Sequence, residues 1–394
     1  MITLVDLQEE SLEITDEWKK IKAVDAKQIP LTKLSKLERW ERTVLANVTF
    51  RYSHKYSKTS VGEKIEKTIF RIFDLPNYTK VNLLIRRLSE GTRELNRYIN
   101  VVEPLLDPKS RFKASRFLCF GILLDSNKSQ PPGQALLSYY LLYPLVDDFV
   151  DDPKTSLQQR KHLMMLLDQT LTDFQSKENQ PEQSSLKLFS SRISRCVKDL
   201  FDSTKDFEQR EELLKALDLV RFAEDFELLG NSADFISAEQ RAAIKGTAAM
   251  IPMAVLQGKE ITYTYLKELL TIGFACQMVD DLQDCAQDLQ AGIQTVFSER
   301  ASKGLNLDDL ACKLLLYLVQ LREKIRKEHP DQFMETLPNA LLYLTLEAIT
   351  QQPKHFSFEF AHQIHKFLPV ISSWTKRHPL EWQLYNFLLK LKLD

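Results

Sequence analysis

The chain has 394 residues, and its 53 basic and 54 acidic side chains leave a net charge of −1. Such a balance provides no overall positive field, so we expect neither nucleic acid nor an anionic membrane as a partner. Only ten residues are glycine, about a third of the usual share of roughly 7%, and they form no phosphate-cradling cluster. This argues against nucleotide enzymes of the doubly wound or P-loop kind and favours a long helical protein.

By composition and helical pattern the chain divides into three segments. Residues 1–74 are charged and lysine-rich, and we predict an N-terminal helical extension there. Over 75–333 the apolar residues recur every three or four positions, which predicts a helical core. Residues 334–394 predict two or three further helices packed on the same domain. The chain has neither a sustained apolar–polar alternation nor an internal repeat, so the expected fold class is all-α.

Individual helices and breaks are clearest at a few places. Leucines recur at helical spacing over 206–229 and 308–327, and helical spacing also occurs over 34–44 and 65–72. Polar stretches without this spacing separate the helices of the core, and they span residues 125–133, 175–185 and 230–234. We therefore expect helices of several turns joined by polar loops.

Cysteine usage and the N-terminus bear on the compartment. The chain has five cysteines, an odd number without a C-x-x-C pair, which is typical of reduced thiols. The N-terminus is acidic and lacks the basic-then-apolar order of a signal peptide. No apolar run approaches the roughly 20 residues that span a bilayer. By elimination we expect a cytoplasmic protein without a transmembrane segment, and we leave open whether it is a monomer or a homodimer.

A first acidic cluster follows an apolar helical run. Its members lie in pairs four positions apart, so that each pair shares a helix face with Cβ atoms about 5–6 Å apart. Pro153 disfavours helix at the preceding residue, which places the cluster at a helix C-terminus. That is the negative end of the helix dipole, an unfavourable place for carboxylates. The four aspartates are Asp147, Asp148, Asp151 and Asp152.

A second acidic cluster also follows an apolar run. Its polar residues fall on one predicted helix stripe over four turns, and the opposite face is apolar and expected to pack against the core. The stripe contains Gly273, Gln277, Asp280, Asp281, Asp284 and Asp288, and the apolar face contains Ile272, Cys276, Val279 and Leu282.

Either cluster alone could be a solvated acidic face, since exposed like-charge pairs cost only about 0.2–0.5 kcal/mol. Two D-D-x-x-D clusters that each end an apolar helix favour a different interpretation. Buried together, their carboxylates would repel one another, and their pKa values would rise unless cations neutralised them. Mg²⁺ prefers oxygen ligands and is often held by carboxylates together with phosphate oxygens. The pair of clusters therefore predicts a site for a metal-bridged diphosphate.

At these residues the chain resembles the class I isoprenoid synthases, the superfamily of trans-prenyl diphosphate synthases, squalene and phytoene synthases and class I terpene cyclases. Residues 274–284 (FACQMVDDLQD) resemble the F-Q-x-x-D-D-x-x-D motif of the trans-prenyl diphosphate synthases. Residues 245–250 (KGTAAM) resemble their K-T-A segment, whose lysine contacts diphosphate, with Gly246 interposed. The resemblance covers roughly residues 75–330 and implies a helical bundle around a central aspartate-lined cavity.

Two arginine-bearing segments of the chain-elongating members are not matched. In place of G-K-R-x-R-P, residues 109–116 read KSRFKASR, and in place of R-R-G, residues 154–161 read KTSLQQRK. Because those arginines bind the second diphosphate, the resemblance points away from elongation with isopentenyl diphosphate. It implies a divergent enzyme of the terpene synthase or squalene synthase kind.

The resemblance also implies roles for individual residues. Three Mg²⁺ ions would be held by both aspartate clusters, Asp288 included, and Asp147, Asp148, Asp280, Asp281 and Lys245 would be catalytic residues. Gln277 would orient the second cluster. Lys245 and Arg221 would contact the diphosphate of a prenyl diphosphate substrate, and Lys245→Ala should weaken binding more than folding. Tyr139 and Tyr143 would line the hydrocarbon pocket, although plain core packing explains them equally well.

Three functions remain open at this point. The first is a Mg²⁺-dependent enzyme that ionises a prenyl diphosphate and then cyclises, eliminates or couples the allylic cation. The second is a chain-elongating synthase with relocated arginines. The third is a catalytically inactive helical partner subunit that keeps the fold.

Overall fold

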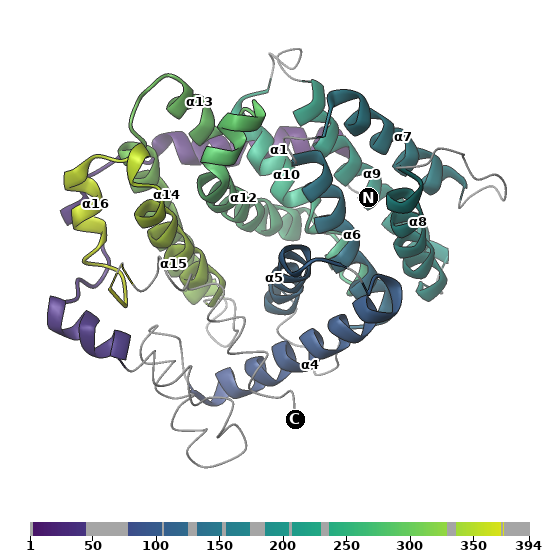
Figure 1. The fold of residues 1–394 in the computed structure, drawn as a ribbon, viewed down its shortest axis with the longest axis horizontal. Coiled ribbons are helices and arrows are strands. Elements are labelled where there is room, and N and C mark those ends of the chain that lie inside the picture. The colour runs from purple at the N-terminus through teal and green to yellow at the C-terminus, as the bar shows by residue number, and fades with distance from the viewer. Residues whose placement is uncertain are drawn as a thin grey trace.

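The structure is a computed structural model, and it describes residues 3–44, 78–104, 106–124, 132–151, 155–173, 186–204, 207–229, 236–328, 336–371 and residue 373. Within these ranges the chain is helical and has no β-strand (Figure 1), which confirms the all-α class. The helices are α1 (Leu4–Lys20), η1 (Ala26–Gln28), α4 (Tyr78–Val102), α5 (Pro108–Leu124), α6 (Gln134–Asp151), α7 (Leu157–Asp173), α8 (Leu186–Ser203), α9 (Phe207–Leu229), α10 (Ala238–Ala248), α11 (Ile251–Leu256), α12 (Tyr263–Ala291), α13 (Val296–Ser302), α14 (Asp308–Glu328), α15 (Thr336–Gln351), η4 (Pro353–His355) and α16 (Phe358–Ile364).

The two most clearly predicted helices are confirmed. The stretches 206–229 and 308–327 form α9 and α14 with bounds that differ by one residue. The first acidic cluster lies at the C-terminal end of α6, as Pro153 predicts. The predicted polar breaks at 175–185 and 230–234, and all but residues 132 and 133 of the break at 125–133, lie outside the described residues. The helical spacing over 34–44 corresponds to a helix that is described over 36–44, whereas the stretch 65–72 lies outside the described residues.

Helix α12 occupies the centre of the molecule and carries the second acidic cluster (Figure 1). It packs against α1, α10, α13, α14 and α15, and α5 in turn packs against α4, α6 and α15. The Thr262 side chain accepts a hydrogen bond from the backbone of Tyr265 at its start, and Gly292 ends it at a φ of 73°. This is the left-handed conformation that glycine adopts without strain.

Two glycines allow α10 and α12 to approach unusually closely. A Cβ added at Gly246 would lie 2.1 Å from the carbonyl oxygen of Gly273, and one added at Gly273 would lie 2.6 Å from the backbone nitrogen of Thr247. Neither distance leaves room for a side chain, so the two backbones are in direct contact. This contact determines how Lys245 on α10 lies relative to the aspartates of α12.

The N-terminal helix α1 belongs to the same core as the central helices. Trp18 is 1% exposed, and its ring meets those of Phe274 and Tyr317 edge-on at 5.6 Å and 6.1 Å between centroids. Lys313 lies over the same ring at 4.5 Å. Helices α15 and α16 also join this hydrophobic cluster. The predicted boundaries near residues 74 and 333 lie outside or beside the described residues and stay predictions.

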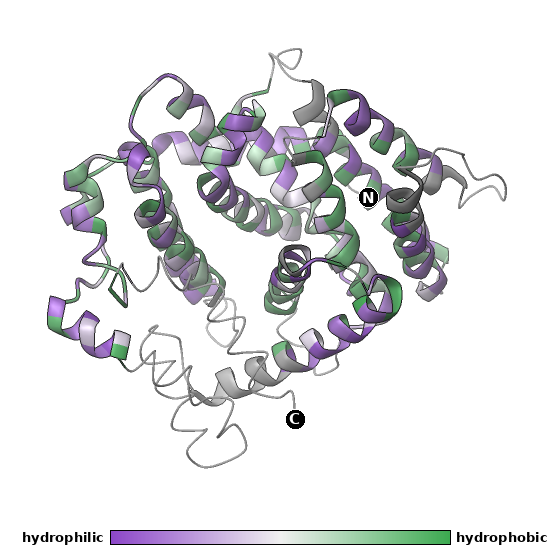
Figure 2. Cartoon of the chain, in the orientation of Figure 1, coloured by the Kyte–Doolittle hydropathy of each residue, from purple (hydrophilic) through white to green (hydrophobic). Residues whose placement is uncertain are grey.

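Hydropathy follows burial along these helices. Apolar residues form the buried cluster, and hydrophilic and hydrophobic residues alternate along the coloured part of α4 (Figure 2). In the described part of the chain, no helix combines the length and the apolar character that a membrane crossing requires. The five cysteines are free; three are buried and two are half-buried.

Candidate functional site

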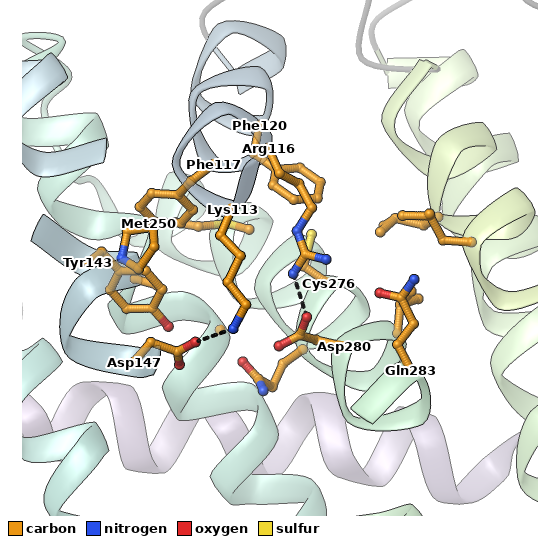
Figure 3. Close-up of a pocket in the computed structure, with 17 residues that line it drawn as sticks. Lys113, Arg116, Phe117, Phe120, Tyr143, Asp147, Met250, Cys276, Asp280 and Gln283 are labelled. Atoms are coloured by element: carbon orange, nitrogen blue, oxygen red, sulfur yellow. Dashed lines mark hydrogen bonds and ion pairs between the residues drawn. The ribbon is translucent and has the colours of Figure 1, made fainter. Parts of the chain in front are cut away.

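A cavity of about 80 Å³ lies between α5, α6, α12 and α15. Polar and apolar side chains line it together, and residues from both aspartate-bearing helices are among them (Figure 3). The lining residues are Lys113, Arg116, Phe117 and Phe120 of α5, Tyr143, Pro144 and Asp147 of α6, Gly246, Ala249, Met250, Cys276, Gln277, Val279, Asp280 and Gln283, and Leu341 and Leu344 of α15.

Two cations from α5 reach the two aspartate helices across this cavity. Lys113 Nζ lies 3.6 Å from Asp147 Oδ2, and Arg116 Nη2 donates to Asp280 Oδ1 at 2.5 Å. Figure 3 shows both cations pointing from α5 toward the aspartates on either side. The cavity therefore has carboxylates from both predicted clusters, and each is paired with a positive charge.

Lys245 is buried on the far side of Asp147. Its Nζ lies 3.3 Å from Asp147 Oδ1 and 3.6 Å from Glu224 Oε2, and the Lys245 and Glu224 side chains are 8% and 1% exposed. Burial alone would raise the pKa of Asp147, but Lys245 and Lys113 outweigh it, and the pKa lies below its usual value. Lys245 thus contacts the first aspartate cluster, and Asp147 is ionised at neutral pH.

Asp284 is a carboxylate near the cavity whose pKa is raised. Burial and the neighbouring charge of Asp280 raise its pKa to about 6, against the opposing effect of Lys113 and Arg116. Its ionised form is therefore unfavourable in the folded chain, chiefly because burial disfavours the charge and further because Asp280 is close.

This shift leads to a testable effect on stability. The raised pKa of Asp284 means that its ionisation lowers the free energy of unfolding. This loss is absent below about pH 4, grows between about pH 4 and 6, and is complete above about pH 6. Asp284→Asn should increase the free energy of unfolding at pH 7.5 by about 1–3 kcal/mol, and the gain should vanish near pH 4. Urea unfolding at both pH values measures this. The control is Asp16→Asn, a change at an exposed carboxylate, which should alter the free energy of unfolding by about 0.5 kcal/mol or less. An equal gain for Asp284→Asn at both pH values would contradict a raised pKa of Asp284.

The aspartates of α12 do not share one face, which corrects the predicted polar stripe. Successive residues on a helix point about 100° apart, so Asp280 faces the cavity whereas Asp281 is 6% exposed and accepts a hydrogen bond from Gln277 Nε2 at 2.8 Å. Asp288 is also buried and accepts from Thr295 Oγ1 at 3.5 Å. Neither lines the cavity. Cys276 and Val279 pack in the hydrophobic core as expected, and they also border the cavity.

The remaining members of the first cluster are described only in part. The backbones of Asp148 and Asp151 lie in the last turns of α6, their side chains are not described, and Asp152 lies outside the described residues. The predicted roles of these three aspartates stay predictions.

The predicted substrate residues Tyr139, Tyr143 and Arg221 gather around a second, smaller cavity of about 40 Å³. Tyr143 lines both cavities and stacks on Phe117 at 4.6 Å between ring centroids. Tyr139 is buried and donates to the carbonyl of Ala249 at 2.9 Å. Arg221 pairs with Asp218 at 2.7 Å and Asp168 at 3.6 Å, so it does not meet the aspartates of the larger cavity.

The donor chemistry of the larger cavity suits a hard divalent cation. Asp147 and Asp280 offer carboxylate oxygens, the ligands that Mg²⁺ prefers. Asp284 lies one turn beyond Asp280 on α12 but does not line the cavity. Among the described side chains, however, no three His, Cys, Asp or Glu residues converge on one point. A metal ion would have to take over from Lys113 and Arg116 as the partner of the two cavity aspartates.

Sequence reasoning missed three charged residues of the site. Lys113 and Arg116 lie within residues 109–116, which were judged only by their poor match to a family motif. The signal that could have found them is a helix with four cations and no acidic residue, of which Lys113 and Arg116 lie one turn apart. Glu224 is the third, a buried acid on an amphipathic helix with many exposed acids, and nothing in its sequence context distinguishes it.

Comparison with other proteins adds no relative. No protein-family model matches the chain, and no curated protein matches it either. The argument for a function therefore depends on the residues of this chain and their geometry.

Proposed function

We propose that the chain is a Mg²⁺-dependent enzyme of the class I isoprenoid synthase type, which ionises a prenyl diphosphate and converts the allylic cation. One observation carries this proposal: a single cavity holds Asp147 from α6 and Asp280 from α12, 133 residues apart in sequence, together with Lys113 and Arg116. Carboxylates for a metal and cations for a phosphate are the two components that metal-bridged diphosphate chemistry needs.

Three cations of this chain would bind the diphosphate. Lys113 and Arg116 enter the cavity from α5, and Lys245 lies behind Asp147. A charge-assisted hydrogen bond to phosphate contributes about 1.5–3 kcal/mol. Asp147, Asp280 and Asp284 would hold Mg²⁺, which when bound acts as a Lewis acid for the departing diphosphate.

The apolar side of the cavity would receive the hydrocarbon chain. Phe117, Phe120 and Tyr143 line it, and aromatic rings there would exclude water and stabilise a positive charge by cation–π contact. At about 80 Å³ the cavity is well below the roughly 300 Å³ of ordinary ligand pockets, so a prenyl chain would require it to widen. Tyr143 also borders the second cavity, which makes it the residue between the two spaces.

The direct test is a product assay with prenyl diphosphates of 10 to 25 carbons, with and without Mg²⁺. We expect a hydrocarbon or alcohol product and inorganic diphosphate only when Mg²⁺ is present. Asp280→Asn should lower the rate by about 100-fold, because metal ligation contributes several kcal/mol to the transition state. Arg97→Gln, on the surface of α4, serves as the control and should retain the rate. An Asp280→Asn rate equal to that of the unchanged chain would contradict this role.

Chain elongation is the second candidate, and the placement of Lys113 and Arg116 favours it. The absence of the family's arginine segments spoke against a second diphosphate, but these two residues bring positive charge to the cavity from the segment that precedes the first cluster. Labelled isopentenyl diphosphate distinguishes the two reactions. Label in a longer prenyl product would establish elongation, and product without label would leave ionisation alone.

A further inference from the structure

A third cavity, of about 270 Å³, lies between α14 and α15. These two helices pack side by side, and α16 packs against α15 (Figure 1). The cavity shares no lining residue with the aspartate cavity, the one of about 80 Å³ that holds Asp147 and Asp280. Its volume is close to the roughly 300 Å³ at which ordinary ligand pockets begin. It is therefore a separate candidate site for a small molecule.

Two arginines of α14 line this third cavity, which we call the arginine cavity. Arg322 and Arg326 are four residues apart and so lie on one face of the helix. Asn339 and Tyr343 line the cavity from α15. Guanidinium, amide and phenol groups all donate hydrogen bonds, and the described residues that line the cavity include no carboxylate. The lining therefore favours an anion as the ligand.

Arg322 has a donor that the described part of the chain does not satisfy. Its side chain is 23% exposed, and its Nε is buried without a hydrogen-bond partner among the described residues. Glu323 Oε1 lies 3.5 Å from this Nε and 3.8 Å from Arg326 Nη1, farther than the about 2.7–2.9 Å of a charge-assisted hydrogen bond. Because a buried donor without a partner is unfavourable, an anion in the cavity would stabilise Arg322.

The charges around the arginine cavity favour a doubly charged anion. Lys33 Nζ lies 5.8 Å from the centre of the Phe367 ring, which lines the cavity. Lys33 and the two arginines are three cations, and in the described part of the chain Glu323 is the carboxylate beside them. A phosphate monoester has a charge of about −1.5 to −2 and three acceptor oxygens, whereas a carboxylate has a single charge and two oxygens. The phosphate group matches this site better.

Apolar side chains form the remaining wall of the arginine cavity. Leu342, Leu346 and Phe367 line it and are 3%, 2% and 4% exposed. An apolar or aromatic group attached to the phosphate would bury its surface against them, which adds to the affinity. We propose that the arginine cavity is a second ligand site of this protein and binds a small phosphate monoester with an apolar group. The proposal does not depend on the function proposed for the aspartate cavity.

Calorimetric titration of the full chain with phenyl phosphate, in the absence of divalent ions, tests the proposal. We expect saturable binding with a Kd of about 1 mM or below. Inorganic phosphate lacks the apolar group and benzoate lacks the second charge, so each should bind at least about tenfold more weakly. No saturable binding of phenyl phosphate, or equal affinity for either of the other two anions, would overturn the proposal.

Variants of Arg322 identify the residue responsible. Arg322→Gln should weaken the binding of phenyl phosphate by about 10- to 150-fold, the loss of one charge-assisted hydrogen bond. Arg322→Lys keeps the charge but not the planar fork of donors, so its affinity should lie between those two, which separates a lost anion contact from a lost fold. Arg97→Gln should bind like the unchanged chain. If Arg322→Gln binds phenyl phosphate as tightly as Arg97→Gln does, the proposal is wrong.

A variant of the aspartate cavity shows which of the two cavities holds the ester. Arg116 lines the aspartate cavity and not the arginine cavity, so Arg116→Gln should bind phenyl phosphate with the affinity of the unchanged chain. Loss of binding in Arg116→Gln together with full binding in Arg322→Gln would assign the ester to the aspartate cavity and overturn the proposal.

Discussion

Gly246→Ala should destabilise the protein by about 3 kcal/mol or more. Its Cβ would lie 2.1 Å from the carbonyl oxygen of Gly273 and 2.6 Å from the carbonyl carbon, and neither backbone atom can rotate away. Helix α10 would have to move off α12, which disturbs a large part of the core packing. Overpacking usually costs about 1–3 kcal/mol, and a backbone clash of this kind belongs at or above the upper end.

Urea unfolding of Gly246→Ala and of a matched variant tests this expectation. Gly133 precedes α6 in open space, where an added Cβ meets nothing within 4 Å, so Gly133→Ala should change stability by only about 0.5 kcal/mol. Gly273→Ala should resemble Gly246→Ala, since the same contact is lost. Equal midpoints for Gly246→Ala and Gly133→Ala would show that the two helices do not approach as closely as described.

Lys245→Ala should lower the free energy of unfolding by about 3–5 kcal/mol, the usual cost of removing one partner of a buried ion pair. Its ammonium group lies between Asp147 and Glu224, and its removal deprives two buried carboxylates of a shared counter-charge. This reverses an expectation from the sequence, by which the substitution weakens diphosphate binding more than folding. Burial makes Lys245 a structural residue as well as a candidate phosphate contact.

A second variant separates charge from packing at Lys245. Lys245→Met retains most of the side-chain volume but not the charge. It should lower the free energy of unfolding by nearly as much as Lys245→Ala does. Adding Glu224→Gln removes the more deeply buried of the two carboxylates and should restore at least about 1 kcal/mol, the coupling expected of contacting residues. The measurement is a double-mutant cycle by urea unfolding, and strictly additive effects of the two substitutions would contradict the pairing.

The fold class and several helix bounds could be predicted because they depend on local chemistry. Leucines at helical spacing define α9 and α14, and the described part of α6, which carries the first cluster, ends at Asp151. Gly246 follows Lys245 directly in the sequence, and Gly273 lies on the predicted stripe of the second cluster. Their direct contact follows from the absence of a side chain on either backbone.

The arrangement of the site could be predicted only in part, because it depends on which helices become neighbours. The pairing of Asp147 and Asp280 around one cavity was expected from the two motifs. The predicted single polar stripe on α12 is wrong, because Asp280 faces the cavity whereas the adjacent Asp281 is bonded to Gln277. The hydrogen bond from Arg116 to Asp280 joins residues 164 positions apart, and no local sequence pattern predicts such a contact.

Release of inorganic diphosphate from a prenyl diphosphate is the measurement that tests the central claim most directly, namely that the cavity between α6 and α12 ionises this substrate. The account predicts Mg²⁺-dependent release by the unchanged chain and by Arg97→Gln, with a loss of about 100-fold in both Asp147→Asn and Asp280→Asn. Asp147→Asn should first be checked for folding, because Asp147 also pairs with the buried Lys245. No release from any substrate of 10 to 25 carbons, or release that persists in both variants, would contradict the claim and favour an inactive partner subunit or a reaction elsewhere.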